Sequence, residues 1–177
     1  RHVVVVGIME QTKDAETKIY ETAGALEQYF GAGPLVLGPT VLSVSDASKS
    51  AKAALSALAV APTVGSSARP IPADKLLPER ALAGDSLAKQ SMLDKYYTPL
   101  ADSQSDLLST LRAYLECGRS LEATSKQLFV HANTVRYRLK RVQEIIIEDP
   151  TDPRSAFMLQ IALALGAISD SESGVRR

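Results

Sequence analysis

The chain has 177 residues, 45% of them hydrophobic, and its 20 basic residues balance 20 acidic ones, so that the formal net charge at pH 7 is zero. This composition is typical of a globular protein with one full domain or two small ones, and it excludes a protein that binds polyanions through overall charge. One cysteine and two histidines exclude an intrachain disulfide and a zinc site built from these residues. No apolar run approaches the roughly 18 residues of a membrane span, and no secretory signal is present, so we expect a cytoplasmic protein without metal or cofactor.

The first part of the chain alternates between expected strands and helices. An apolar run over residues 2–8 predicts a buried strand, and a helical pattern follows over residues 13–30. Residues 34–45 predict one or two short strands, after which Asp46 is expected to cap a helix over residues 47–59. Residues 1–62 are therefore expected to form a partial α/β domain.

Prolines are concentrated between Pro62 and Pro99, where they interrupt both helical and strand periodicity. This break predicts a linker over residues 63–101. One connecting helix is expected inside it, capped by Asp85 or Ser86 and stopped by Pro99.

Residues 102–168 predict a bundle of helices, followed by a flexible tail over residues 169–177. A leucine-rich amphipathic helix comes first and has Gly118 past its end. Ser120 can cap a short second helix, which a tight turn joins to a third helix at about 132–146. The last helix is expected over residues 153–168, and because it is apolar nearly all round, part of it is expected to meet a second chain.

The third helix of this bundle has two different faces. At about 100° per residue, Val135, Leu139 and Val142 fall within roughly one third of the circumference. The other face carries side chains suited to phosphates and base edges in a DNA major groove. They are Asn133, Thr134, Arg136, Tyr137, Lys140 and Arg141. Six basic residues against one acidic residue give residues 119–141 a net charge of 6 − 1 = +5.

The expected roles of these side chains differ. The three cations at 136, 140 and 141 suit phosphates, whereas Asn133 is either a base reader or a residue of the first helical turn. Tyr137 could touch a sugar-phosphate or a thymine methyl group. Arg138 lies nearer the buried edge, so it either contacts DNA or pairs with an acidic neighbour such as Glu122, and His131 is expected to cap the helix.

The run TLRAYLECGRSLEATSKQLFVHANTVRYRLKRVQEI, followed by DPRSAFMLQIALAL, resembles the carboxy-terminal helix-turn-helix domain of PucR/CdaR-type bacterial transcriptional regulators, over residues 107–165. Residues 1–60 resemble, more weakly, the later part of the GGDEF-like domain that often precedes it. The resemblance implies an α+β protein, with a truncated α/β GGDEF-like unit before an all-α bundle. It also implies a ligand-responsive regulator that binds double-stranded DNA as a homodimer, under control of an upstream sensory region and its small-molecule effector.

Two positions depart from this family. Ala132 stands where family members usually carry proline, which is a small change because either residue fits the first turn of a helix. Residues 144–148 contain no glycine for a left-handed stop, where the family commonly has a Thr-Gly pair. The third helix is therefore expected to run on toward Asp149.

The GGDEF-like resemblance does not predict an enzyme. Dinucleotide cyclases hold two metal ions with carboxylates on a tight hairpin, and no Gly-Gly-Asp/Glu-Glu-Phe string occurs in this chain. One alternative to a DNA reader stays open: a degenerate nucleotide-binding GGDEF-like sensory or oligomerisation module that uses the helical domain for protein contacts.

Overall fold

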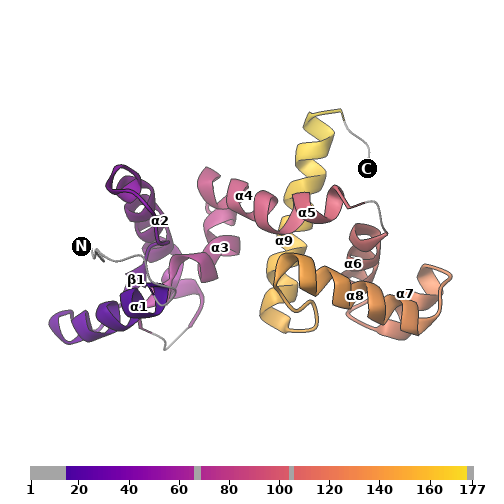
Figure 1. Ribbon diagram of the computed structural model, residues 1–177, viewed down its shortest axis with the longest axis horizontal. Coiled ribbons are helices and arrows are strands. Elements are labelled where there is room, and N and C mark those ends of the chain that lie inside the picture. Colours follow the sequence, from indigo (N-terminus) through magenta and orange to yellow (C-terminus); the bar gives the residue numbers. More distant parts are fainter. Residues whose placement is uncertain (1–14, 66–68, 104–105, 175–177) are drawn as a thin grey trace. The chain divides into compact units, whose positions relative to one another are not determined.

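The computed structural model describes residues 15–65, 69–103 and 106–174, which form two compact units divided between Ala88 and Lys89 (Figure 1). These residues are mostly helical and include one sheet of two strands. The expected strand over residues 2–8 lies outside the described ranges. The expected domain boundaries near residues 62 and 102 stay predictions. No helix in the described ranges is long and apolar enough to cross a membrane.

Unit 1 is built on a strand, a helix and a second strand. Its elements are α1 (Ala15–Ala25), η1 (Leu26–Tyr29), β1 (Val36–Leu37), η2 (Val44–Asp46), α2 (Ala47–Val60), η3 (Ala61–Thr63), β2 (Ile71–Pro72), η4 (Ala73–Leu76) and α3 (Leu77–Leu82). The two strands are parallel, and Val36 lies opposite Ile71. The α2 helix therefore forms the crossover that a parallel pair requires.

Two details of unit 1 differ from the sequence-based expectation. The second strand comes from the proline-rich stretch, because a proline at the end of a two-residue strand costs little hydrogen bonding. Asp46 occupies the N-cap position of α2, but its side chain caps nothing there. It pairs with Lys49 at 2.8 Å, while Ser43 accepts the free backbone N–H of Ser45 just upstream.

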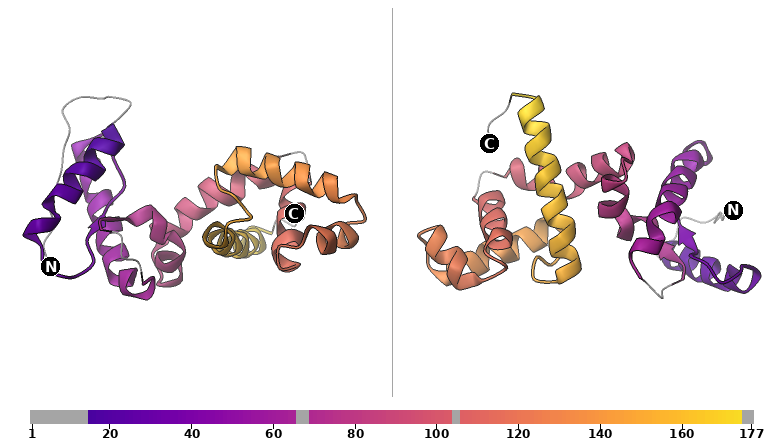
Figure 2. Two further views of the ribbon diagram at one scale, coloured as in Figure 1. Left: turned by 90° about the horizontal axis from the view of Figure 1, so that it is seen from below. Right: turned by 180° about the vertical axis from the view of Figure 1, so that it is seen from behind.

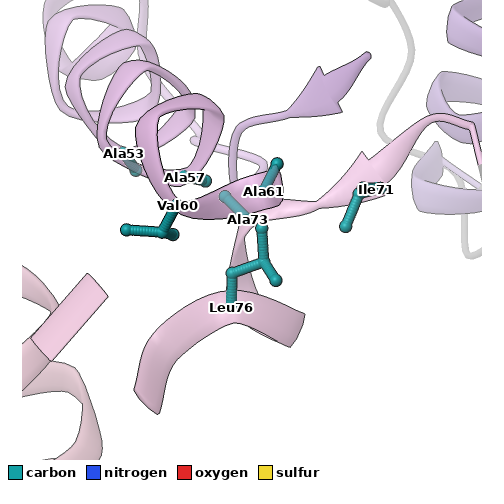
Figure 3. Close-up of a cluster of buried hydrophobic side chains, with 7 residues drawn as sticks. All are labelled: Ala53, Ala57, Val60, Ala61, Ile71, Ala73 and Leu76. Atoms are coloured by element: carbon teal, nitrogen blue, oxygen red, sulfur yellow. The ribbon is translucent and has the colours of Figure 1, made fainter. Parts of the chain in front are cut away.

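The core of unit 1 is made mostly of small side chains between α2 and the segment that follows it (Figure 3). Its buried members are Ala53, Ala57, Val60, Ala61, Ile71, Ala73 and Leu76. Alanines on one face of α2 allow β1 and η4 to approach the helix closely, and Leu76 of η4 joins them in the core.

A buried ion pair lies near the carboxy end of unit 1. Arg80, 2% exposed, donates to the Asp85 carboxylate at 2.9 Å and to the Ala73 carbonyl at 3.2 Å. The other oxygen of Asp85 accepts the backbone N–H groups of Leu87 and Ala88, so it caps α4 (Ser86–Met92) as expected. Burial acts to raise the pKa of Asp85, but hydrogen bonds from Ser56, Ala88 and Arg80 outweigh it and hold the pKa below its usual value.

The helix that begins at Ser86 runs further than expected. After α4 it widens into the π-helix η5 (Leu93–Tyr97) and continues as α5 (Thr98–Ala101). Pro99 does not stop it: this proline sits in the first turn of α5, where proline is tolerated, directly after the π-helical turn. Met92 and Tyr96 are buried, whereas Leu87 is 49% exposed.

The long carboxy-terminal helix packs against η5 and α6 in unit 2 (Figure 2). This helix, α9 (Pro153–Glu172), starts as expected, with Asp152 accepting the backbone N–H of Ser155 at 2.8 Å. It does not end at residue 168: the Tyr97 hydroxyl donates to Asp170 at 2.6 Å, which holds the last turn. Gly166 lies against the ring of Tyr97.

Replacing Gly166 with alanine should destabilise unit 2 by about 1–3 kcal/mol, because the added methyl group would overlap the buried Tyr97 ring. Urea unfolding followed by circular dichroism measures this change. Gly24→Ala is the control, since nothing lies within 4 Å of the added carbon there. An unfolding midpoint of Gly166→Ala equal to that of the parent would contradict the close packing.

Candidate nucleic-acid interface

Three helices in unit 2 contact one another and form the expected helix-turn-helix: α6 (Leu107–Glu116), α7 (Leu121–Gln127) and α8 (Ala132–Ile146) (Figure 1). Ser120 caps α7 by accepting the backbone N–H of Ala123 at 3.2 Å. His131 caps α8 through Nδ1, which accepts the backbone N–H of Asn133 at 3.1 Å. Both caps confirm the expectation from the sequence, and they fix where α8 begins.

The inner face of α8 is the apolar stripe that the sequence predicts. Val135 and Val142 are fully buried and Leu139 is 6% exposed, while Ile146 extends the stripe by one turn. Leu111 of α6 and Thr124 of α7 are also fully buried. Since both α6 and α7 contact α8, this packing leaves only the outer face of α8 in solvent.

The outer face of α8 carries the six side chains expected to bind DNA. Five are exposed and Thr134 is half-buried. Asn133 accepts a hydrogen bond from Arg136 at 2.6 Å, and Arg141 pairs with Glu144 at 2.6 Å. In the described ranges Lys140 has no ion pair, and the Tyr137 side chain stands out with 64% exposure. We name this set, Asn133, Thr134, Arg136, Tyr137, Lys140 and Arg141, the α8 outer face.

Arg138 belongs to the support of α8 and not to its outer face. Its guanidinium donates to the carboxylate of Asp106 at 2.7 Å and to the hydroxyl of Thr110 at 3.2 Å. Thr110, fully buried, donates in turn to the Asp106 carbonyl at 2.6 Å. The expectation of an ion pair is confirmed, but the partner is Asp106 and not Glu122. Sequence inspection missed Asp106 and Thr110 because they lie far from Arg138 along the chain.

The turns that end α6, α7 and α8 each contain a left-handed residue other than glycine. These residues are Arg119 (φ 67°), Phe129 (φ 54°) and Ile147 (φ 56°). The expectation that α8 runs toward Asp149 is therefore wrong: the helix ends at Ile146, and Ile147 takes the left-handed position. A β-branched residue is strained there, and Ile147 is 87% exposed, so burial offsets little of that strain.

Replacing Ile147 with glycine should stabilise unit 2 by about 0.5–1 kcal/mol, since relief of the left-handed strain exceeds the extra entropy of the unfolded chain. Urea unfolding measures the gain. The matched control is Gln143→Gly, which places a glycine in the exposed interior of the same helix and should cost about 1 kcal/mol. Destabilisation by both changes would contradict the strain at Ile147.

Comparison with known domains agrees with this geometry. Residues 107–165 match the PucR C-terminal helix-turn-helix domain. These residues form a PucR-type helix-turn-helix domain. The match spans α6, α7 and α8 together with the first part of α9, and it confirms the predicted helix-turn-helix domain.

Sequence similarity to known proteins extends beyond the PucR-type domain. An uncharacterized protein of Mycobacterium tuberculosis is 43% identical over 140 residues, which cover 79% of this chain and 34% of that protein. The purine catabolism regulatory protein of Bacillus subtilis is 38% identical over 80 residues, covering 41% of this chain and 15% of that protein. The chain thus spans about a third or less of the length of these curated relatives.

A solved structure also resembles the chain over most of its length. The crystal structure of a regulator of polyketide synthase expression from Bifidobacterium adolescentis has a TM-score of 0.78 at 40% sequence identity. The similarity covers 85% of this chain and 60% of that one. The fold described here therefore occurs in a protein described as a regulator of polyketide synthase expression.

Proposed function

We propose that this protein is a sequence-specific transcriptional regulator that inserts α8 into the major groove of double-stranded DNA. The observation that carries the proposal is the division of α8 into a buried seam and an outer face that holds three exposed cations, Arg136, Lys140 and Arg141. Since α6 and α7 both contact the inner side of α8, this face projects outward as one surface. A recognition helix requires that arrangement.

We assign different roles to the side chains of the outer face. Arg136 and Lys140 neutralise phosphates, and Arg141 joins them by exchanging Glu144 for a phosphate, because an exposed ion pair is worth only about 0.3–0.5 kcal/mol. Asn133, in the first turn of α8, approaches base edges. Its carbonyl accepts from Arg136, so the two side chains would approach DNA as one polar unit.

A homodimer follows from the small number of these contacts. A single recognition helix offers few base contacts, each worth about 1–3 kcal/mol, which is too little to compete with the nonspecific sites of a genome. Two copies would present two α8 helices to half-sites about 34 Å apart, one turn of DNA. The operator would then be an inverted repeat.

Unit 1 is proposed to be the remaining part of a GGDEF-like domain through which an effector bound upstream controls DNA binding. Its parallel β1–α2–β2 arrangement supports an α/β origin. We propose a regulatory role without catalysis, in the cytoplasm. Incubation with GTP and magnesium should therefore give no turnover, and a dinucleotide product would contradict this assignment.

Selection of bound sequences from random duplexes tests the proposed function directly. The expected result is an enriched inverted repeat with half-site centres about 10 base pairs apart. Binding should weaken steeply as salt rises, because each neutralised phosphate releases counterions. An intact fold by circular dichroism, together with no preference for any duplex at low ionic strength, would refute the proposal.

A further inference from the structure

Helix α9 carries apolar side chains on two adjoining sides. One side is buried in unit 2 and comprises Ser155, Ala156, Met158, Leu159, Ala162, Leu163 and Gly166. On the side that adjoins it, Phe157, Ile161 and Leu165 are half-buried, and Ile168 is 56% exposed. A helix that is apolar all round is normally covered on both sides, so this second stripe calls for a further packing partner.

The second stripe has a regular composition. Successive members are three, four, four, three and four residues apart, which keeps them within about 80° of the helix circumference. They are Arg154, Phe157, Ile161, Leu165, Ile168 and Glu172. We name this set the α9 stripe. A cation stands at its amino end, a carboxylate at its carboxy end, and four apolar side chains lie between them.

This order makes the α9 stripe complementary to itself when one copy is reversed. In an antiparallel pair Arg154 faces Glu172, Phe157 faces Ile168, and Ile161 faces Leu165. Opposite charges then meet at both ends of the apolar contact, whereas a parallel pair would place like charges together at both ends. A reversed second copy matches the pattern at every position, which is the condition for a two-fold symmetric interface.

We infer that two copies of this chain pair through their α9 stripes in antiparallel orientation. This inference rests on the proposed dimeric DNA reader and gives that dimer its interface. The exposed side chains that flank the stripe, Ala164 and Ala167, are small enough for the two helices to approach within about 8–10 Å. The Arg154 guanidinium already lies along the stripe, 5.6 Å from the centre of the Phe157 ring.

Cysteine cross-linking tests the orientation. In a Cys117→Ser background, which removes the native thiol, chains with Arg154→Cys and chains with Glu172→Cys are prepared separately with different tags. Oxidation of their mixture should give a disulfide between the two kinds of chain, and each chain alone should give none. Disulfides between identical chains would overturn the antiparallel pairing, as would the absence of any disulfide in the mixture.

Sedimentation equilibrium without DNA tests the interface itself. Ile168→Asp should raise the dimer dissociation constant at least tenfold, and because Ile168 is largely exposed the fold should persist by circular dichroism. Ile147→Asp, at another exposed isoleucine outside α9, should leave the dissociation constant unchanged. A parent chain that is monomeric at tens of micromolar would overturn the inference. Binding to a single half-site by α8, measured separately, reports whether the proposed function fails instead.

Discussion

Reversing the charges of Arg136 and Lys140 together, as Arg136→Glu with Lys140→Glu, should lower affinity for the selected operator by about 100- to 1,000-fold at moderate salt. Both side chains are exposed on α8 and neither packs in its buried seam, so the fold should be unaffected. The reversal replaces two phosphate contacts with two repulsions. Fluorescence anisotropy over a range of salt concentrations should show the salt slope reduced by about two.

A matched control distinguishes the effect of direct DNA contact by α8 from the effect of the protein's net charge. Lys18→Glu with Lys52→Glu makes the same change in net charge at two exposed lysines of unit 1. It should leave operator affinity and salt slope nearly unchanged. Equal losses for both double variants would show that DNA responds only to net charge, and the α8 outer face would lose its role. If α8 served protein contacts instead, the reversal on α8 would alter self-association and not DNA binding.

Replacing Asp85 with asparagine should destabilise unit 1 by about 3 kcal/mol at neutral pH. The change leaves the Arg80 guanidinium, which is 2% exposed, without a counter-charge. Hydrogen exchange of α2 and α3 measures the loss locally, since Asp85 is bonded to Ser56 in α2 and to Arg80 in α3. Asp94→Asn is the control, because Asp94 is exposed and accepts a hydrogen bond from the neutral side chain of Gln90.

The pH dependence of this contribution has a definite sign. The pKa of Asp85 is lower in the folded chain than in the unfolded chain, where it should be about 3.9. The stabilisation is therefore fully present above the unfolded value and is lost as pH falls through the folded value. Asp85→Asn should remove this acid-dependent component. A parent and a variant that lose unit 1 stability in parallel below pH 4 would contradict the assignment.

Local sequence patterns were sufficient to predict helix α8 and its buried face. The spacing of Val135, Leu139 and Val142 predicts the buried seam, because a helix places such residues on one side whatever surrounds it. Ser120 and His131 could be identified as caps for a similar reason, since a cap bonds to backbone only two or three residues away.

Features that depend on distant contacts could not be predicted in this way. Arg138 finds Asp106 only after α6 and α8 have packed, so the nearer Glu122 was the wrong partner. Ile147 takes the left-handed backbone conformation that a sequence rule assigns to glycine. The chain must turn there toward Asp152 and α9, and this requirement overrides the preference of isoleucine for a negative φ. The strand β2 could not be predicted, because it contains a proline, which disfavours a strand locally. It forms through pairing with β1, and that pairing depends on the crossover helix between the two strands.

The Asp85 cap bears on how unit 2 could be prepared alone. A truncation that begins at Lys89, where unit 2 begins, would cut through α4 and remove the Asp85 cap together with the first three residues of the helix. Its first turn would fray, and Met92, fully buried in the whole chain, lies just beyond that turn. A recombinant fragment that starts at Gly84 or earlier would retain the carboxylate and a defined helix start.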